Sequence, residues 1–366
     1  MRKMIISKKK DAIGQGIEYF LTKEEYREHS FLYFNITVDP GNDASDAFNR
    51  IKGYLEKIEC TILFGLGFGF NMPGPGRELK KILPVMLFSY GQQNSPGLQL
   101  ICTDDKEVVS ENTENNIYCN SVKHNNRRLH YFYDIIPGKK NDCYDQAYKS
   151  FSMLGNLLKR KSISYASLAR TWLYLDSILN WYDELNRART DFYEREDIFS
   201  ILIPASTGIG VSNEHGSCIS LSAMAVTGED ARQYVSPVDS PLQCSAVDYK
   251  SSFSRAVEID LKGSKRLIIS GTASIDEQGD TLYPVSAGKQ VNHTMRVVNA
   301  IMDHKDYSWD NVVRAIVYFP DLSNRRYFDD YCKKNKLDRS AVLVVSGVVC
   351  RDNLLFEIEL DAVKSV

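Results

Sequence analysis

The clearest candidate for acid–base chemistry is a carboxyl group near the C-terminal end of the chain. Glu357 and Glu359 alternate with apolar residues in the segment Leu-Phe-Glu-Ile-Glu-Leu-Asp at 355–361. This two-residue period predicts a β-strand with two unlike faces. If the face with Glu357 is covered, its carboxyl group must find a partner or keep its proton, because desolvation raises the pKa of an acid. Such a position can supply a general acid; the alternative is that both glutamates face solvent.

A second candidate is an arginine within an apolar segment. Apolar residues recur at helical spacing between 164 and 185, at Leu168, Trp172, Leu175, Leu179 and Tyr182. The pattern predicts a helix that is apolar nearly all round and therefore buried. Arg170 and Tyr174 then lie one turn apart on one face. A buried arginine needs an anion, which is either a ligand carboxylate or a protein carboxylate such as Asp176, Asp183 or Glu184.

Other catalytic chemistries find little support. The six histidines are dispersed, and the acidic pair Asp104-Asp105 has no histidine beside it, so we expect no metal site. His215 and Ser217 lie close together, but a Gly-x-Ser-x-Gly turn for a nucleophilic serine is missing. The glycines at 65–70 lack the spacing of a dinucleotide-binding loop. We therefore expect no dinucleotide-binding loop and no serine nucleophile at these positions.

The composition is that of an ordinary globular protein. Hydrophobic residues make up 43% and charged residues 25% of the sequence. The 45 Lys and Arg residues nearly balance the 47 Asp and Glu residues. This balance argues against a nucleic acid or a membrane surface as partner, because both favour a basic excess. A membrane-spanning apolar run is also missing.

The cysteines and the N-terminus bear on the cellular compartment. The eight cysteines are scattered, without a Cys-x-x-Cys pair, so we expect free thiols in a reducing cytoplasm. The first ten residues are basic but are not followed by the apolar region of a signal peptide. We therefore expect a cytoplasmic protein.

The length of 366 residues exceeds what one hydrophobic core usually supports and predicts two domains. We place the boundary near residue 195, with an N-terminal α+β domain at 1–195 and a C-terminal domain at 196–366. From about 250 the pattern predicts the order β, β, α, β, α, β, β, with helices near 290–302 and 324–334. Strands with helices on one face give an α+β fold class.

Six short motifs in the C-terminal region resemble the RidA/YjgF domain. In order they are Ser-Phe-Ser-Arg-Ala at 252–256, Ile-Ser-Gly-Thr-Ala at 269–273, Gln290, Val-Val-Arg-Ala at 312–315, Arg-Ser-Ala at 339–341 and Phe-Glu-Ile-Glu at 356–359. The resemblance implies a RidA/YjgF-like, or chorismate mutase-like, C-terminal domain packed against a related, diverged N-terminal α+β domain.

Further segments extend the resemblance to the chorismatases of bacterial secondary metabolism, also labelled pteridine-dependent deoxygenase-like proteins. These segments are 170–182, 204–210, Gln243 and Asp248-Tyr249. The resemblance is dense from about 164 to 363. It implies a hydrolase or lyase without a cofactor that acts on chorismate, in a cleft of the C-terminal domain closed by the N-terminal one.

The resemblance also assigns roles to single residues. The acid of the family's final strand falls on Glu357, and the substrate-binding arginines fall on Arg170 and Arg255. A family tyrosine falls on Tyr249 or on Tyr234. Family members commonly carry an aspartate four residues before the acid, where this chain has Asn353.

Two residues bear on the product. Cys350 resembles the cysteine of the branch that forms 3-hydroxybenzoate, whereas Ala273 resembles the alanine of the branch that forms a dihydrodiol. The two markers disagree, so the product stays open between a hydroxybenzoate and a dihydroxycyclohexadiene carboxylate. Cys350 can also be a small buried residue at a strand end.

The chemistry of chorismate fits these residue types. Chorismate has two carboxylates, and arginine can bind each of them bidentately. Cleaving its enol ether requires a proton on the terminal methylene carbon, and water or the ring hydroxyl then attacks the oxocarbenium-like centre. Glu357 with a raised pKa can supply that proton. We therefore expect chorismate to be cleaved to pyruvate and a ring product.

Two other functions remain alternatives. One is a RidA-type imine deaminase, in which Arg339 would bind the substrate carboxylate. The other is a catalytically silent protein that binds a small aromatic acid, an alternative that rests on Asn353. RidA proteins are short homotrimers with sites between subunits, so this longer chain can be either a monomer or a homotrimer.

Overall fold

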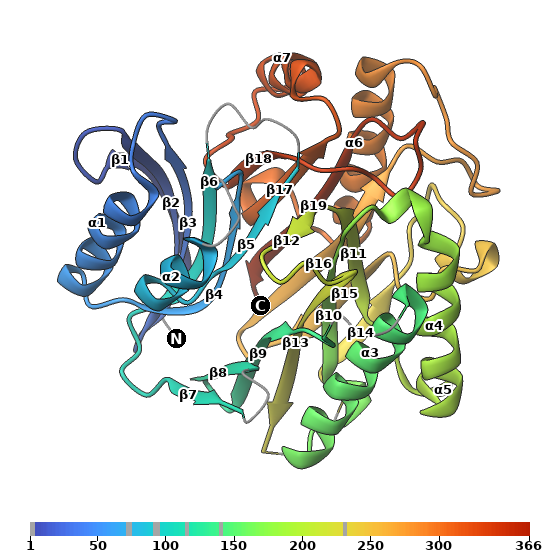
Figure 1. The fold of residues 1–366 in the computed structure, drawn as a ribbon, viewed down its shortest axis with the longest axis horizontal. Coiled ribbons are helices and arrows are strands. Elements are labelled where there is room, and N and C mark those ends of the chain that lie inside the picture. Colours follow the sequence, from blue (N-terminus) through green and yellow to red (C-terminus); the bar gives the residue numbers. More distant parts are fainter. Residues whose placement is uncertain (1–3, 71–74, 91–95, 114–116, 139–141, 230–232) are drawn as a thin grey trace.

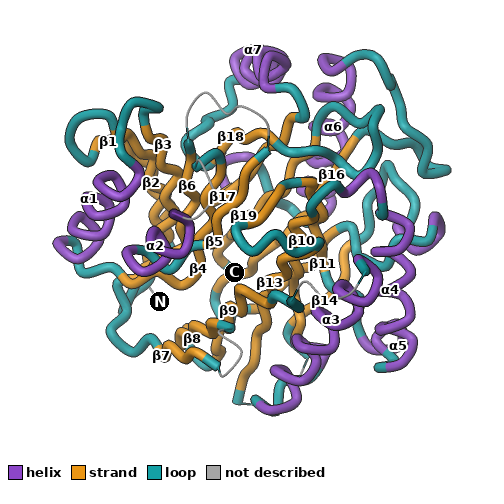
Figure 2. Tube along the Cα trace, viewed as in Figure 1, coloured by secondary structure: helices purple, strands orange, loops and turns teal. Residues whose placement is uncertain are grey.

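The computed structural model describes residues 4–70, 75–90, 96–113, 117–138, 142–229 and 233–366. Three mixed β-sheets meet in the middle of the molecule, and helices cover their outer faces (Figure 1, Figure 2). Helices α1 and α2 lie at the left of Figure 1, α6 and α7 at the top, and α3 and α4 at the lower right. The fold class is α+β, as the sequence predicts.

The first unit contains the first sheet. Its elements are β1 (Ile5–Ala12), β2 (Ile17–Glu25), β3 (Ser30–Val38), α1 (Ala44–Lys57), β4 (Thr61–Phe68), α2 (Pro75–Ile82), β5 (Met86–Ser89) and β6 (Gly97–Thr103). The strand order is β1-β2-β3-β6-β4-β5, and the short β12 (Ser212–Asn213) of the next unit adds to the β5 edge. Only β4 and β5 run parallel within the unit.

The second unit repeats this plan. Its elements are β7 (Val109–Asn112), β8 (Tyr118–His124), β9 (Arg127–Ile135), α3 (Cys143–Arg160), β10 (Leu168–Leu175), α4 (Tyr182–Arg195), α5 (Ile198–Ile201), β11 (Ala205–Gly210) and β13 (Ile219–Gly228). The order β7-β8-β9-β13-β10-β11 corresponds strand by strand to the first sheet, and again only the last two strands of this order, β10 and β11, run parallel.

The third unit has the same plan once more. Its elements are β14 (Val235–Val238), β15 (Ala256–Asp260), β16 (Ser264–Ala273), α6 (Ala287–His304), β17 (Val312–Phe319), α7 (Arg325–Asn335), β18 (Val342–Ser346) and β19 (Glu357–Ser365). The order is β14-β15-β16-β19-β17-β18, with β17 and β18 parallel. From β15 onward the elements follow one another along the chain in the predicted order β, β, α, β, α, β, β.

The units therefore correspond to one another in strand order and direction. The region before the C-terminal domain is related to it, as expected, and contains the same topology twice. The expected boundary at residue 195 falls at the end of α4, so strands of the second sheet come from both sides of it. We propose a division by sheets instead, into 5–103, 109–228 and 235–365.

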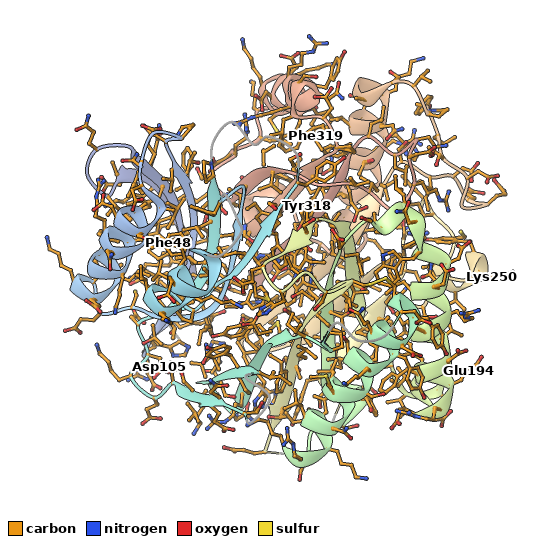
Figure 3. All side chains as sticks on the ribbon, viewed as in Figure 1. Phe48, Asp105, Glu194, Lys250, Tyr318 and Phe319 are labelled. Atoms are coloured by element: carbon orange, nitrogen blue, oxygen red, sulfur yellow. A yellow bond between two sulfur atoms is a disulfide. The ribbon has the colours of Figure 1, made fainter. Side chains whose placement is uncertain are left out.

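The core has four main parts. Three clusters fill the space between each sheet and its own helices. The fourth is shared, because aromatic and aliphatic residues from the inner faces of all three sheets pack together at the centre. Figure 3 shows Tyr318 of β17 in this central region. The shared core fixes how the three sheets face one another, and so builds the surfaces between units.

The segment with Arg170 is a strand rather than the predicted helix. All eight residues of β10 are buried, so both faces are covered and the sequence does not show the two-residue alternation of a half-exposed strand. Continuous apolar runs of this kind do not distinguish a buried strand from a buried helix. Helix α4 begins only at Tyr182.

One expectation about the cysteines was wrong. Cys143, at the start of α3, and Cys218, just before β13, form a disulfide that joins residues 75 positions apart. The fold brings these two ends of the second unit together, which no local sequence pattern shows. Six cysteines are free thiols, so the cysteines no longer support the expected reducing compartment.

Within the described ranges, the helices lack the combination of length and apolar character that crossing a bilayer requires.

Candidate active site

Glu357 is the first residue of β19 and is only 5% exposed. Burial, together with the nearby charge of Glu359, raises its pKa to about 8. The carboxyl group therefore holds its proton at neutral pH. Gly271 of β16 makes room for it, since a β-carbon at this position would collide with Oε1 of Glu357. Both glutamates are buried, so the solvent-facing alternative is excluded.

Glu357 lines a small cavity between the second and third units. The cavity has a volume of about 60 Å³. Its walls come from β10, α4 and β11 on one side and from the third unit on the other. The lining residues are Leu173, Tyr182, Leu185, Arg189, Ser206, Gly208, Tyr249, Phe253, Arg255, Gly271, Ala273, Ile275, Cys350, Arg351, Leu354 and Glu357.

The repeated topology allows the position of Glu357 to be compared among the three units. Glu357 pairs with Tyr318 of its sheet, Gly97 pairs with Phe68 in the first sheet, and Ser220 pairs with Tyr174 in the second. Gly97 and Ser220 therefore occupy the positions equivalent to Glu357. The acid is present in one of the three units.

The residue that faces each position from the neighbouring unit also differs. The β-carbon position of Gly97 lies 3.0 Å from Cδ1 of Leu343, and Ser220 Oγ lies 4.0 Å from Sδ of Met86. Thr207 occupies the same position as Leu343 and Met86 in the pairing of the two parallel strands of its unit. Large apolar side chains thus fill two of the three equivalent interfaces, whereas the third has a smaller, polar residue at this position.

Two arginines of the cavity have no carboxylate partner among the described residues. Arg255 is 5% exposed; its Nε donates to the carbonyl oxygen of Cys244, and its Nη2 has no partner. Arg189 on α4 is 3% exposed and donates only to the side chain of Asn186, while its Nε has no partner. Both guanidinium groups lie beside the ring of Phe253, at 5.8 and 5.6 Å for Arg189 and Arg255. The cavity is therefore rich in buried positive charge.

The sequence missed Arg189 as a site residue. Its position held a signal, because Arg189 falls on the same helix face as the buried residues Leu185, Ala188, Phe192 and Tyr193. A charged residue on the buried face of an amphipathic helix needs a partner.

Arg170 does not line the cavity. It forms ion pairs with Glu359 and with Asp361, whose Oδ1 lies 3.0 Å from Nη1, and Nη2 donates to Thr207. Arg314 binds the same two carboxylates. Although burial raises the pKa of Glu359, the two arginines hold it below its usual value. The sequence left open whether Arg170 binds a ligand carboxylate or a protein carboxylate, and the structure shows that it binds protein carboxylates.

The two candidate tyrosines separate clearly. Tyr249 lies in a short 3-10 helix (Ala246–Tyr249) and lines the cavity, where its ring packs 5.2 Å from the guanidinium of Arg255. Burial raises its pKa to about 12, so it keeps its hydroxyl proton. Tyr234 lies outside the cavity lining, and Arg127 stacks on its ring at 3.7 Å.

Cys350 and Ala273 both line the cavity. Burial, with a further contribution from Glu357, raises the pKa of the Cys350 thiol to about 11. The thiol is therefore protonated at neutral pH and is a weak nucleophile. Tyr182 of α4 also lines the cavity, on the side of Cys350.

The residues behind the two alternative functions lie elsewhere. Arg339 pairs with Asp329 of α7 at 2.5 Å and is not part of the cavity lining. Asn353 accepts a hydrogen bond from Thr281 through its side chain and one from Gln290 through its carbonyl group. Asn353 thus builds the turn before β19 rather than facing the cavity.

The corresponding place between the first and second units holds a charged cluster. Asp134, Glu214 and His215 bring possible metal-ligand atoms within 4.8 Å of one another. The ammonium group of Lys80 on α2 lies among them and pairs with both carboxylates. Lys80 thus offsets part of the negative charge of this cluster, and the expectation that the chain has no metal site stays a prediction.

Comparisons with known proteins follow this geometry. Residues 244–364 match the family described as Endoribonuclease L-PSP. A chorismatase solved at 1.08 Å resolution superposes with a TM-score of 0.63 and 18% identity over 90% of this chain and 98% of its own. The chain has the chorismatase fold. The resemblance that the sequence showed to this branch of the RidA-like superfamily is thus confirmed at the level of the fold.

Smaller structures match one part of this fold. Yeast Mmf1 is 22% identical, with a TM-score of 0.30, and the match covers 36% of this chain and 99% of Mmf1. A putative endoribonuclease from Thermotoga maritima is 21% identical, with a TM-score of 0.30, over 36% of this chain and 98% of its own. No curated protein matches the sequence.

Proposed function

We propose that the protein is a chorismatase, which cleaves the enolpyruvyl ether of chorismate to pyruvate and a ring product. One observation carries this proposal: a buried glutamic acid that keeps its proton shares a small cavity with two arginines that have no carboxylate partner among the described residues. The shared fold with a chorismatase supports it. An acid and two anion-binding groups are what a dicarboxylate with an acid-labile ether requires.

Glu357 is the general acid. Its proton goes to the terminal methylene carbon of the enol ether, and the ether carbon becomes an oxocarbenium-like centre. Water or the ring hydroxyl then attacks this centre and loses a proton to the Glu357 carboxylate, and collapse releases pyruvate. The raised pKa of Glu357 serves this role, because an acid is most effective when its pKa lies near the operating pH.

Arg189 and Arg255 bind the two carboxylates. The equivalent interface supports this role by contrast, because Lys80 of α2 pairs with Asp134 and Glu214 there. Arg189, on the corresponding helix of the second unit, pairs with no described carboxylate. Leaving a buried guanidinium unpaired is costly, and a substrate carboxylate removes that cost. Arg170 has no place in this set, since it binds Glu359 and Asp361.

The ring product depends on which nucleophile attacks. Cys350 and Ala273 both border the space where the ring would lie, and they resemble markers of different branches. A protonated thiol can exclude water from one side of the ring and favour attack by the ring hydroxyl. The product is therefore either 3-hydroxybenzoate or a dihydroxycyclohexadiene carboxylate.

The test is turnover of chorismate by the purified protein. Pyruvate is followed with a coupled assay, and the ring product is identified by mass spectrometry. We expect pyruvate from the wild-type protein and a loss of at least about a hundredfold in the Glu357→Gln variant, the lower end of what a general acid contributes. Full activity in a folded Glu357→Gln variant would remove the acid from this role. A wild-type protein that binds chorismate without releasing pyruvate would contradict the enzymatic function.

A further inference from the structure

The cavity around Glu357 is too small for the proposed substrate. Its volume is about 60 Å³, whereas sites for small molecules usually measure about 300–1,000 Å³. A groove of about 1000 Å³ lies next to it and shares four lining residues with the cavity: Tyr182, Tyr249, Cys350 and Arg351. These four residues form a partition between the cavity and the groove.

One wall of the partition is joined to α4 by hydroxyl groups alone among its side-chain hydrogen bonds. We call residues 245–252 the cap segment; it contains the 3-10 helix with Tyr249. Its flanks are anchored, because Gln243 donates to two backbone carbonyl groups and Ser254 bonds to the backbone at Ile203. Across the groove, its side-chain bonds to α4 join hydroxyl groups: Tyr182 with Ser251 at 3.4 Å and Thr190 with Ser252 at 2.9 Å. Such contacts can break without leaving a buried charge.

Both acidic and basic side chains line the groove. Its α4 wall presents Asp183, Glu184, Asp191 and Glu194, together with Arg187. Lys250 lies on the cap segment, and Figure 3 shows it and Glu194 at the periphery of the molecule. Acidic groups on α4 repel an anion from that wall. An incoming dicarboxylate is therefore directed to the opposite wall, which holds Arg351.

Arg351 is the one cation that lines both spaces. It is partly exposed, and its Nη1 donates to the carbonyl oxygen of Gly279 at 2.6 Å. In the described part of the chain it forms no ion pair with a carboxylate. Its remaining N–H groups are thus available to an anion in the groove, beside Cys350 and Tyr249.

We propose that Arg351 is the capture residue of the site: it binds a carboxylate of the substrate in the groove before the cap segment opens, and hands the anion on to Arg255 and Arg189. The inference rests on the proposed function and names a specificity residue for it. A capture residue acts on the association step, so its loss lowers kcat/KM and leaves kcat nearly unchanged.

The test compares the Arg351→Gln variant with Arg351→Lys and with Arg326→Gln, which removes an exposed arginine on α7 far from the groove. Chorismate turnover is measured at ionic strengths at which the Debye length falls from about 30 Å to about 3 Å. We expect kcat/KM of Arg351→Gln to fall about tenfold at low salt, with kcat changed less than twofold. The salt dependence of kcat/KM should also flatten, because the charge that attracts the substrate is gone.

The outcomes separate capture from a purely structural role. Arg351→Lys should keep most of kcat/KM, and Arg326→Gln should match the wild type. A loss of kcat in Arg351→Gln, or an unchanged salt dependence, would overturn the proposal. If the wild type releases no pyruvate, the proposed function fails. The role of Arg351 is then tested by comparing the association rates of 3-hydroxybenzoate with the wild type and with Arg351→Gln. Binding is followed by the fluorescence of Trp181 in the groove wall. Equal rates, or no binding at all, would then count against capture.

Discussion

At the scale of single residues, two carboxyl groups on one strand are held in opposite states. Glu357 and Glu359 are both buried on β19. Glu359 is charged because Arg170 and Arg314 bind it. Glu357 has no such partner, and both burial and the charge of Glu359 favour its protonated form. Pairs of acids whose surroundings push their pKa values apart are typical of acid catalysis.

The raised pKa of Glu357 predicts how stability depends on pH. Its folded pKa is about 8, above the usual 4.5, so the folded state holds a proton that the unfolded state releases between these values. Stability is therefore lost as pH rises from about 4.5 to 8, by an amount on the order of 5 kcal/mol. Glu357→Gln should be more stable than the wild type at pH 9 and differ little at pH 4. Urea unfolding at several pH values measures this difference.

The same group predicts the pH dependence of turnover. The protonated form is the acid, so kcat/KM should fall as pH rises through about 8. A rate that rises through this range, or a stability difference between wild type and Glu357→Gln that does not change with pH, would mean that Glu357 is ionised in the folded protein.

Several site residues could be named from the sequence because short motifs carry them. Glu357, Arg255, Tyr249, Cys350 and Ala273 lie around one cavity, as the resemblance implies. The sequence did not decide whether Arg170 binds a ligand or a protein carboxylate, since a local pattern does not show which carboxylates the fold brings to an arginine. The carboxylates that bind it are 189 and 191 positions away.

At the scale of elements, the C-terminal strands and helices were predictable and β10 was not. Helices α6 and α7 have one apolar and one polar face, which gives a clear helical period. Strand β10 is buried on both faces, so its sequence shows no period of two. Strand β8 (118–124) contains several polar residues and no clear apolar run, because the faces of a sheet inside the molecule accept polar residues that find partners.

The cap segment gives a prediction at this scale. If it must leave α4 to admit substrate, a covalent bond across the contact between Thr190 and Ser252 should stop turnover. The double variant Thr190→Cys/Ser252→Cys, once oxidised, should lose more than about nine tenths of its activity, since substrate entry then requires an opening that the bond prevents. Reduction should restore the activity, because the hydroxyl contact of 2.9 Å is replaced by two free thiols.

The controls for this experiment come from the same chain. Each single cysteine variant should stay active under oxidation. The wild type, which has its own Cys143–Cys218 disulfide, shows what the reductant does by itself. Full turnover by the cross-linked protein would place the route to Glu357 elsewhere.

At the scale of the whole molecule, one chain contains three copies of one topology, and their meeting surfaces are filled differently. Leu343 and Met86 fill two interfaces, the third has the smaller Thr207 at the equivalent position, and the cavity with Glu357 lies between the units there. Both walls of the cavity come from the same chain. We therefore propose a monomer with one site per chain, the first of the two assemblies that the sequence left open.

A buried polar network ties the three units together at the centre. Arg314 donates to Gln99 of the first unit at 2.7 Å, and Arg170 of the second unit reaches Glu359 and Asp361 of the third. The indole N–H of Trp172 also donates to Glu359, at 3.2 Å. Two arginines and two carboxylates balance in charge inside this network. Removing one arginine leaves a buried carboxylate without its partner.

Arg170 and Arg189 therefore make a matched pair for the last prediction. Arg170→Gln should lower the free energy of unfolding by about 3–5 kcal/mol, as the loss of one partner of a buried ion pair does. Arg189→Gln should not lower the free energy of unfolding, because no protein carboxylate is left behind and a costly unpaired guanidinium is removed, and it should raise KM for chorismate about tenfold or more, the effect of one charge-assisted hydrogen bond. Urea unfolding and steady-state kinetics measure both. A stable Arg170→Gln protein with a raised KM would indicate that Arg170 binds the substrate, and would contradict the assignment of the network to folding.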